Sequence, residues 1–348
     1  MPTDALSETF YSARETWVLW LILIGSMGML AVGADRAVTA AVALARALRV
    51  SKVIIGATVV SLGTTMPEMC VSVIAAIKGD GSLALGNAVG SIIADTGLIF
   101  GLCAALKAIP KDRFVLNRHG WLQLGSGTLL TVLCFGLWAL AGDIHQVTLP
   151  RVVGLGLVAL LVGYLVLSVR WGREHPETLS ETVGPVPAPP GRVAAVLRHV
   201  LVLAVGLGVV VGGSELLIGS AKVICGRYGV PPAVLAVTLV ALGTSLPELV
   251  TALVALIKGH EELAVGNIIG ADILNVLFVA GAASLAAPLK VEPAFFYLYL
   301  PVMMVVLLLF RAYILMGGDR FRRWQGAILM AVYVGFIILA VKLGVGGP

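Results

Sequence analysis

The stretch GATVVSLGTTMPEMCVSVIAAIKGDGSLALGNAVGSIIAD at residues 56–95 recurs 180 positions later as AVTLVALGTSLPELVTALVALIKGHEELAVGNIIGADILN at residues 236–275. Across residues 56–104, 18 of the 49 positions carry the same amino acid as their counterpart in the second copy. Two unrelated apolar helices would share Leu, Val and Ala by chance, whereas these matches include glycine, threonine, proline, glutamate and asparagine. The chain therefore contains an internal duplication.

The composition around this repeat is that of a membrane protein. Of the 348 residues, 59% are hydrophobic and only 12% are charged, and the mean hydropathy is +1.02. A soluble domain needs more charge than this, and several apolar runs exceed the roughly 20 residues that span a bilayer. We predict an all-α polytopic protein with ten membrane segments, at residues 16–48, 51–77, 82–107, 119–141, 149–169, 193–224, 230–257, 262–287, 292–313 and 322–344.

The ten predicted segments fall into two groups of five. Residues 1–170 form the first five-helix repeat, residues 193–348 form the second, and a polar, Pro-rich linker at 171–192 joins them. Because each repeat has an odd number of helices, the second must enter the membrane upside down relative to the first. Inverted repeats are typical of secondary transporters, whose ion site lies at the repeat interface near the middle of the membrane.

The distribution of basic residues predicts the orientation of the protein. Loops after the odd-numbered segments hold 16 of the 24 Lys and Arg residues, whereas the opposite loops and both termini together hold seven. Cytoplasmic loops carry an excess of Lys and Arg, so we expect a multi-pass protein of the cell membrane with both termini outside. The sequence pI of about 9.1 reflects this topology and requires no nucleic-acid partner.

Proline interrupts the second and the seventh segment at equivalent places. Pro67 and Pro247 lack the N–H that would bond the carbonyl four residues earlier, and their rings crowd that carbonyl. Freed backbone oxygens at membrane depth are tolerated only against protein or a watery cavity. Glu68 and Glu248 follow these prolines directly. An ionised carboxylate at that depth costs at least about 2.5–3.5 kcal/mol, so the two glutamates mark an ion or proton path.

Further oxygen donors surround the two glutamates in the sequence, and the cores of these segments carry no basic side chain. Six to eight hard oxygens with two or more carboxylates suit Ca²⁺, whereas fewer and mostly neutral oxygens suit Na⁺. We therefore expect a shared site that holds one divalent ion or several monovalent ions in turn. The predicted ligands are Glu68, Glu248, Thr64, Thr244, Asp95, Asn275, Ser91, Thr65 and Ser245.

Three further polar features allow two interpretations each. The paired GNxxG turns at 86–90 and 266–270 favour close helix packing over ion ligation. Asp272 is either an acid that lines a cavity or a hydrogen-bond acceptor at a helix end. Asp35 and Glu215 are repeat counterparts midway along the first and sixth segments. We interpret them as vestibule acids or as partners of basic residues, such as the adjacent arginine, rather than as ion ligands.

The duplicated motifs resemble those of the cation/calcium exchanger superfamily, in particular its prokaryotic sodium/calcium exchangers. GTTMPE at 63–68 and GTSLPE at 243–248 resemble the first half of that family's two alpha repeats. GNAVGSIIAD at 86–95 and GNIIGADILN at 266–275 resemble the second half. Through the repeat and the ten-segment plan, the resemblance extends over the whole chain.

The resemblance implies roles for the predicted ligands. Glu68 and Glu248 would bind both Ca²⁺ and Na⁺, and Thr64 and Thr244 would add backbone and side-chain oxygens. The other predicted ligands would complete the Na⁺ or middle sites. The first and sixth segments would slide across the core and expose the site to each side of the membrane in turn.

Several residues depart from the family pattern. In archaeal-type exchangers the middle pair is Asn in the first repeat and Asp in the second, and here Asp95 and Asn275 reverse it. Ala271 replaces the usual serine, and Ile92 and Asp272 replace the asparagines of the usual GSN. These departures leave both Na⁺ and H⁺ as candidate counter-ions.

The sequence thus predicts a secondary antiporter, not an enzyme, that exchanges Ca²⁺ for Na⁺ by alternating access and normally extrudes Ca²⁺. The alternative on the same fold is exchange of Ca²⁺ or another divalent cation for protons. A Ca²⁺-permeable channel would pass current without a counter-ion, and an intramembrane aspartyl protease would need a GxGD motif, which the sequence lacks. The sequence contains no P-loop motif, so ATP binding is not predicted, and no cofactor is expected. The predicted partners are inorganic cations and the lipid bilayer.

Overall fold

The computed structural model describes residues 10–48, 52–174, 192–228 and 244–343. These residues are helical apart from turns and one pair of two-residue strands. Eight of the helices, together with one bent helix pair, are long and apolar enough to cross a membrane. The prediction of an all-α polytopic membrane protein is therefore confirmed.

The first half of the chain contains five apolar units, three of them built from a single helix and two from several consecutive segments. They are α2 (Thr16–Leu48); α3 (Lys52–Ile55), η1 (Gly56–Val60), α4 (Ser61–Thr64) and α5 (Met66–Ile77); α6 (Gly81–Ile92), η2 (Ile93–Phe100) and α7 (Gly101–Leu106); α8 (Arg113–Ala141); and α9 (Arg151–Glu174). The short η3 (Ile144–Gln146) follows α8. Of these segments, η1 and η2 are π-helical, a rare geometry that occurs often at functional sites.

The described residues of the second half also form five units. They are α10 (Arg192–Arg227); α13 (Leu246–Ile257); α14 (Glu261–Leu274), η5 (Asn275–Ala280) and α15 (Gly281–Ala286); η6 (Phe295–Tyr299) and α16 (Leu300–Leu315); and α17 (Arg323–Lys342). Here η5 and η6 are π-helical. The predicted seventh segment at 230–257 is described only from residue 244 onward, and its earlier part lies outside the described residues.

Two units form the centre of the molecule. In the unit Gly81–Leu106, 72% of the most apolar window is buried inside the protein, and in Glu261–Ala286 the share is 83%. The corresponding share is 22% for Leu116–Ala141 and 28% for Thr16–Ala47. The two central units are repeat counterparts, so residues from both copies of the duplicated motif meet in the core.

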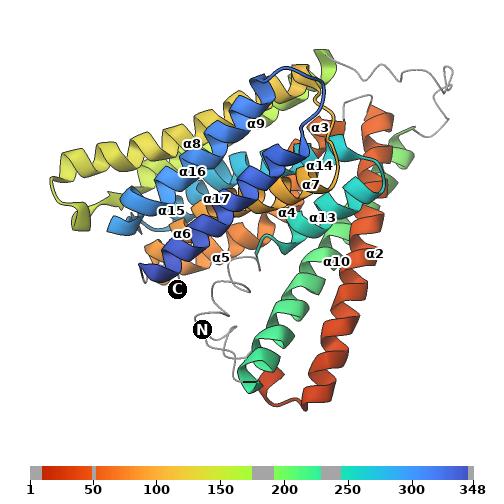
Figure 1. Cartoon of the computed structure of the whole chain (residues 1–348), viewed down its shortest axis with the longest axis horizontal. Helices are drawn as coiled ribbons and strands as arrows, with labels where there is room; N and C mark the ends of the chain where they lie inside the picture. Colours follow the sequence, from red (N-terminus) through yellow and green to blue (C-terminus); the bar gives the residue numbers. More distant parts are fainter. Residues whose placement is uncertain (1–9, 49–51, 175–191, 229–243, 344–348) are drawn as a thin grey trace.

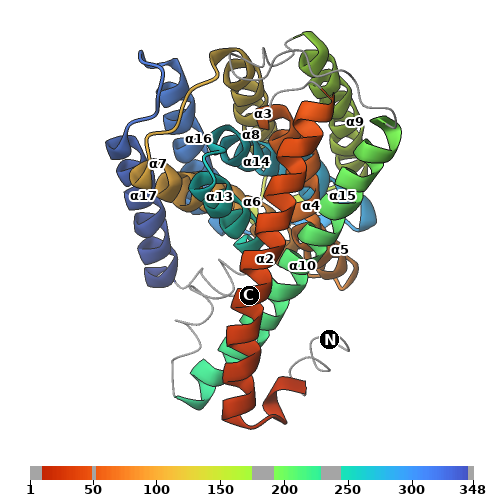
Figure 2. The same cartoon turned by 90° about the vertical axis from the view of Figure 1, so that its right-hand side faces the viewer.

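The helices α2 and α10 lie side by side and project from the rest of the molecule (Figures 1 and 2). Each packs chiefly against the other, and the pair touches the remainder through α13 and short neighbouring segments. Their backbones approach closely at glycines: a Cβ on Gly206 would lie 3.0 Å from the carbonyl oxygen of Gly33. The two helices therefore form one packed pair beside the core.

The duplication is also visible in two tight turns. Gly79 follows α5 with φ of 85°, and its counterpart Gly259 follows α13 with φ of 74°. Both angles lie in the left-handed region, which glycine adopts at little cost. The same Lys-Gly turn therefore leads from the second unit into the third and from the seventh into the eighth.

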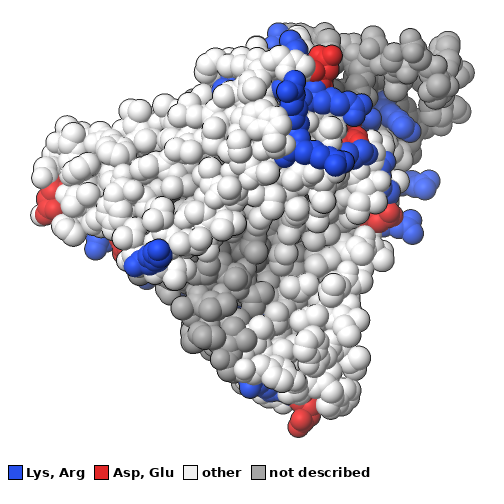
Figure 3. Space-filling model, in the orientation of Figure 1, with Lys and Arg blue, Asp and Glu red and all other residues white. Residues whose placement is uncertain are grey.

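Loops after the odd-numbered units meet at one end of the molecule. Lys107, after the third unit, forms an ion pair with Glu261, after the seventh. Lys52, after the first unit, lies 3.8 Å from the carboxylate of Glu262. Figure 3 shows Lys and Arg side chains gathered at this end, whereas the broad surface beside it carries few charges. We refer to it as the basic end.

Loops after even-numbered units meet at the opposite end. There β1 (Thr148–Leu149) pairs antiparallel with β2 (Leu289–Lys290), so that Thr148 faces Lys290. Gly81 lies against the same strand, because a Cβ on it would come within 2.5 Å of the backbone nitrogen of Lys290. The loops thus alternate between the two ends, as expected for a chain that repeatedly crosses a membrane.

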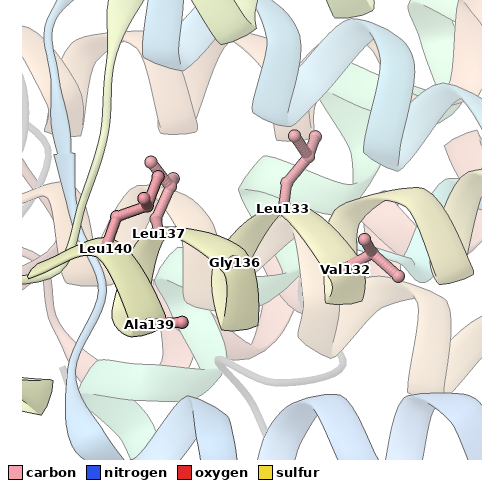
Figure 4. A pocket seen from close by; sticks show the side chains of 6 residues that line it. All are labelled: Val132, Leu133, Gly136, Leu137, Ala139 and Leu140. Carbon is pink, nitrogen blue, oxygen red and sulfur yellow. The ribbon is translucent and has the colours of Figure 1, made fainter. Parts of the chain in front are cut away.

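The outward face of α8 is apolar. An open hollow on it is lined only by Val132, Leu133, Gly136, Leu137, Ala139 and Leu140 (Figure 4). Val132 and Leu140 are 61% and 86% exposed. Such a surface suits contact with lipid chains and offers no oxygen to an ion, so the site must be sought in the core.

Candidate ion-binding site

The first glutamate lies where the second unit is broken. The helix ends at Thr64, a new helix starts at Met66, and the two parts meet at an angle of 44°. Pro67 is in the first turn of α5, where a missing N–H costs little because no intrahelical acceptor exists for it. Glu68 is in the same turn, at the positive end of the helix dipole. The predicted break is confirmed here.

The second glutamate occupies the same position in the other copy. α13 starts at Leu246, and Pro247 and Glu248 are in its first turn. The residues immediately before Thr244 lie outside the described part, so nothing is stated about the chain on that side of α13. Both glutamates thus share a local structure: a proline-led helix start that places a carboxylate next to free backbone N–H groups.

Three acidic side chains of the predicted site are buried. Asp95 is fully buried, and Glu68 and Glu248 are each 1% exposed. Each has one carboxylate oxygen that accepts no hydrogen bond from the described residues: Glu68 Oε2, Glu248 Oε2 and Asp95 Oδ1. The segment 229–243, which lies outside the described residues, contains no Lys or Arg in its sequence and so offers these acids no basic partner. Buried carboxylates without a basic partner are costly unless a cation or proton neutralises them.

These acids interact across the interface between the two repeats. Glu68 and Asp95 each interact electrostatically with Glu248. Thr65 of the first repeat donates a hydrogen bond of 3.3 Å to Glu248 Oε1 of the second. Ser245 of the second repeat lies beside both Glu68 and Asp95, although its hydroxyl makes no well-aligned hydrogen bond among the described residues. Each acid is therefore approached by hydroxyls of the opposite repeat.

Asp95 and Asn275 meet in the middle of the core. Asp95 is in η2 and Asn275 begins η5, so both stand where a central helix widens to π geometry. The amide Nδ2 of Asn275 lies 3.5 Å from Asp95 Oδ2, and the amide oxygen Oδ1 accepts no hydrogen bond from the described residues. That oxygen and Asp95 Oδ1 remain available to a cation.

The asparagines of the two GNxxG turns form crosswise links that the sequence interpretation underrated. Thr64 donates to Asn267 Oδ1 at 3.3 Å, and Thr244 donates to Asn87 Oδ1 at 3.2 Å. Asn87 also donates at 3.1 Å to the backbone carbonyl of Glu68. The asparagines thus hold the threonines and one acid-bearing helix in place. Their identity in both copies was the sequence signal that pointed to this role.

The glycines of the GNxxG turn at 266–270 allow the close helix packing that the sequence predicts. A Cβ on Gly270 would lie 2.5 Å from both the carbonyl oxygen of Ala57 and the hydroxyl of Ser61. A Cβ on Gly266 would collide with the backbone of Val53. Glycine therefore lets α14 rest directly on the broken second unit.

Asp272 belongs to a separate buried cluster. Its side chain is 1% exposed, and its Oδ2 accepts a hydrogen bond from Thr96 and another, of 2.5 Å, from Gln123. Asp272 is thus a hydrogen-bond acceptor in the last turn of α14, and its donors are side chains of two other helices. Sequence reasoning missed Thr96 and Gln123. A lone glutamine within an apolar segment was the available signal for the latter.

The remaining predicted positions differ in their surroundings. Ser91 is 3% exposed but makes no hydrogen bond to the acids among the described residues. Asp35 is paired with Lys258, whose Nζ lies 2.7 Å from its Oδ1, rather than with Arg36. Glu215 is exposed on α10. The structure therefore brings eight of the nine predicted ligands into one linked group and leaves Asp35 and Glu215 outside it.

The chemistry of this group is that of a hard-cation site. No three of the described His, Cys, Asp and Glu side chains lie close enough together to hold one metal ion. Hydroxyl and amide oxygens of the same group lie beside the carboxylates. Oxygen ligands of this kind are those that hard cations such as Ca²⁺ and Na⁺ take in proteins.

Known proteins are similar to this chain over nearly its whole length. The profile of the family described as "Sodium/calcium exchanger protein" matches residues 18–170 and 198–342. The inner membrane protein YrbG of Escherichia coli is 32% identical over 93% of this chain and 95% of its own length. The sodium/calcium exchanger MaX1 of Methanosarcina acetivorans is 28% identical over 92% of this chain and 98% of its own.

A solved structure has the same fold. The sodium-calcium exchanger NCX_Mj, in crystals soaked with Na⁺ and Sr²⁺, superposes with a TM-score of 0.76 at 27% sequence identity, over 94% of this chain and 99% of that one. The family profile covers both halves, including both copies of the acidic motif. This multi-pass membrane protein therefore belongs to the sodium/calcium exchanger family.

Proposed function

We propose that this protein is a secondary antiporter that exchanges Ca²⁺ for Na⁺ across a cell membrane and normally extrudes Ca²⁺. One observation carries the proposal: Glu68 and Glu248, each buried with an unpartnered oxygen, interact across two equivalent helix starts. Relatives named as sodium/calcium exchangers support the same two transported ions, Ca²⁺ and Na⁺. Both ions are cargo, and the proposed exchange uses neither ATP nor a resident cofactor.

The ligands that we assign serve both ions. Glu68 and Glu248 supply the two carboxylates that a Ca²⁺ ion needs, and neutral oxygens of Thr64, Thr244 and Asn275 complete its coordination. Na⁺ ions use subsets of the same oxygens together with Thr65, Ser91, Ser245 and Asp95. Because the sets overlap, Ca²⁺ and Na⁺ exclude each other, and exclusion of one ion by the other is the first requirement of antiport.

Coupling follows from the cost of moving charge. An empty site would carry buried carboxylates past a dry barrier, whereas a site loaded with Ca²⁺ or Na⁺ is largely neutralised. Only loaded forms should therefore change the side to which they open. The α2–α10 pair, whose helices pack chiefly on each other, is the element that we assign to this movement.

The basic end supports an orientation of the protein in the membrane. We place this end in the cytoplasm, because Lys and Arg are enriched in cytoplasmic loops, and both chain termini outside. A cysteine introduced by Asp319→Cys at the basic end and another by Asp143→Cys at the opposite end test this assignment. An impermeant thiol reagent added to intact cells should label the variant at 143 and leave the one at 319 unlabelled. The opposite pattern would reverse the orientation.

The transport assay uses purified protein in liposomes. Radioactive Ca²⁺ should enter vesicles loaded with Na⁺, and little should enter vesicles without a Na⁺ gradient. Glu248→Gln keeps the shape of the side chain and removes its charge, so it should abolish this uptake. Asp143→Asn, at a partly exposed acid of the opposite end, is the matched control and should transport normally. Normal turnover by Glu248→Gln would refute the site.

The same assay separates the alternative counter-ion. Vesicles that carry only an outward proton gradient test exchange of Ca²⁺ for H⁺, which the reversed positions of Asp95 and Asn275 favour. Uptake driven by the proton gradient alone would replace Na⁺ with H⁺ in the proposal. Uptake with neither gradient, accompanied by current, would identify a channel.

A further inference from the structure

Three helices hold Asp272 beside the ion site. Asp272 is on α14, Thr96 is on η2 and Gln123 is on α8. All three are buried, with exposed fractions of 1%, 0% and 2%. Gln123 Nε2 lies 2.5 Å from Asp272 Oδ2 and 3.2 Å from Thr96 Oγ1, and Thr96 also donates to Asp272 Oδ2. The cluster is thus a closed triangle of side chains.

The partners of Asp272 present hydrogens to it rather than oxygens. The Thr96 hydroxyl and the Gln123 amide nitrogen both donate to the same carboxylate oxygen, Oδ2. The other oxygen, Oδ1, is buried and has no hydrogen-bond partner among the described residues. A metal ion needs several converging acceptor oxygens, which this arrangement does not offer. A proton needs only one free carboxylate oxygen, and Oδ1 is that oxygen.

The charges near Asp272 do not neutralise it. Asp95 on η2 is an acid and interacts electrostatically with Asp272. Helix α13 also packs on α14, and the titratable group that it carries is another acid, Glu248. The basic groups on elements packed against α14 have other partners. They are Lys52, which lies near Glu262; Arg113, which lies near Asp319; and Arg118, which lies over the rings of Phe114 and Trp171. His119 on α8 makes ring contacts with Tyr164 and Trp171.

We propose that Asp272, held by Thr96 and Gln123, is a proton-binding site separate from the cation ligands, and that its proton is released when a cation binds beside Asp95. The inference rests on the proposed function, since it needs a cation at the neighbouring site. The proton leaves Oδ1 for the solvent on the side to which the site is open, and Asp272 keeps the negative charge. Ca²⁺ brings two positive charges and one leaves with the proton, so the buried charge rises by one instead of two, whereas Na⁺ brings one and the charge stays unchanged.

The coupling follows from electrostatics and linkage. An ionised Asp272 makes the potential at Asp95 more negative and strengthens cation binding there, whereas a protonated Asp272 does not. Coupling between two binding sites is reciprocal, so cation binding must also weaken proton binding at Asp272. Acidic conditions should therefore lower the apparent affinity for Ca²⁺ through this side chain.

Proton release on Ca²⁺ binding is the direct measurement. Purified wild-type protein in detergent and weak buffer is titrated with Ca²⁺ while released protons are counted with a pH indicator, and calorimetry records the Ca²⁺ bound. Asp272→Asn has no carboxyl proton to lose, so it should release up to one proton fewer per bound Ca²⁺ than wild type does. Asp143→Asn, at a partly exposed acid of the opposite end, is the matched control and should release as many protons as wild type.

A second variant keeps the carboxyl group and covers the case in which Asp272→Asn does not fold. Thr96→Val removes one hydrogen bond to the charged form of Asp272. A hydrogen bond to a charged group is strong enough to move a titration by about one pH unit. Thr96→Val should therefore shift the pH midpoint of Ca²⁺ affinity upward by about one unit. An unchanged midpoint would contradict the inference.

The remaining outcomes are distinct. If Ca²⁺ binds and Asp272→Asn releases as many protons as wild type, the proton site is wrong and the proposed exchange stands. If wild type binds Ca²⁺ without releasing any proton, the proton site is again wrong. If wild type binds neither Ca²⁺ nor Na⁺, the proposed function fails and this inference fails with it.

Discussion

Asp95 and Asn275 occupy equivalent positions in the two repeats and touch each other, with Asn275 Nδ2 lying 3.5 Å from Asp95 Oδ2. A symmetric pair of two aspartates would place two negative charges together in a buried site, which is costly. A pair of two asparagines would leave no charge there. The combination of one acid and one amide supplies one negative charge and one hydrogen bond within the pair.

This contact predicts that the charge can be moved between the two positions. Asp95→Asn removes a negative charge next to the proposed Ca²⁺ ligand Asn275 and should raise the KM for Ca²⁺ by about tenfold, because a lost interaction with a charged group costs about 1.5–3 kcal/mol. Adding Asn275→Asp restores the charge a few ångströms away and should recover most of the affinity. The KM values are measured by Ca²⁺ uptake into Na⁺-loaded vesicles. A double variant as weak as the single one would show that the two positions are not interchangeable.

The packing of α14 on the broken unit predicts a stability effect. Gly270→Ala would place a Cβ 2.5 Å from the backbone oxygen of Ala57, and overpacking of this kind costs about 1–3 kcal/mol. The melting temperature, followed by tryptophan fluorescence in detergent, should fall. Gly125→Ala on α8 is the control, because no described atom lies within 4 Å of its Cβ. It should leave stability unchanged or raise it, since alanine favours helix. Equal melting temperatures for the two variants would exclude a tight contact at Gly270.

The link between Lys258 and α2 predicts a small effect on transport. Lys258 Nζ lies 2.7 Å from Asp35 Oδ1 and donates at 2.6 Å to Thr39 Oγ1, so it joins the end of α13 to the α2–α10 pair. Asp35 is 53% exposed, and exposed ion pairs contribute about 0.2–1 kcal/mol. Asp35→Asn should therefore change the apparent Ca²⁺ affinity by at most about fivefold. In a double-mutant cycle with Lys258→Met, the two effects should not add. Additive effects would mean that the pair does not act as a unit.

The protonation of His260, at the basic end, should make the stability of the protein depend on pH. Burial and then the nearby Lys52 ammonium lower the pKa of His260 below its ordinary value of 6.5. The unfolded chain therefore binds a proton here more readily than the folded protein does. Stability that is present above pH 6.5 is lost as the pH falls toward the lowered pKa.

The substitution His260→Asn tests this effect. Asparagine starts helices well, so it keeps the beginning of α14 and removes the titrating group. The melting temperature of the variant should fall less than that of wild type between about pH 7 and about pH 5. Buried acids contribute to both proteins equally, so the difference between the two curves isolates His260. Parallel curves would count against the assignment.

The sequence was sufficient for those features that repeat or that depend on local chemistry. The lengths of the apolar runs predict the helical units, and Pro67 predicts the break before Glu68. The matched Glu68 and Glu248 identify the centre of the candidate site without any coordinates. Each of these features depends on a few neighbouring residues or on a comparison of two stretches of one chain.

Contacts between distant segments could not be predicted in this way. The partner of Asp35 is Lys258, 223 positions away, and not its neighbour in sequence. Gln123 meets Asp272 only because α8 and α14 pack at one particular rotation. The π-helical turn at η2 changes which way Asp95 faces, and no residue pattern in the segment announces such a turn. Rotation and packing of whole helices decide these contacts.

The crosswise bonds from Thr64 to Asn267 and from Thr244 to Asn87 have a consequence for the history of the chain. Each half supplies the asparagine that completes the other half, so a half-length protein would build the site only as a pair of subunits inserted in opposite directions. Fusion of two such copies into one gene removes the requirement that both subunits be identical. Asp95 and Asn275 are equivalent positions that differ in this way, because one repeat carries the acid and the other the amide.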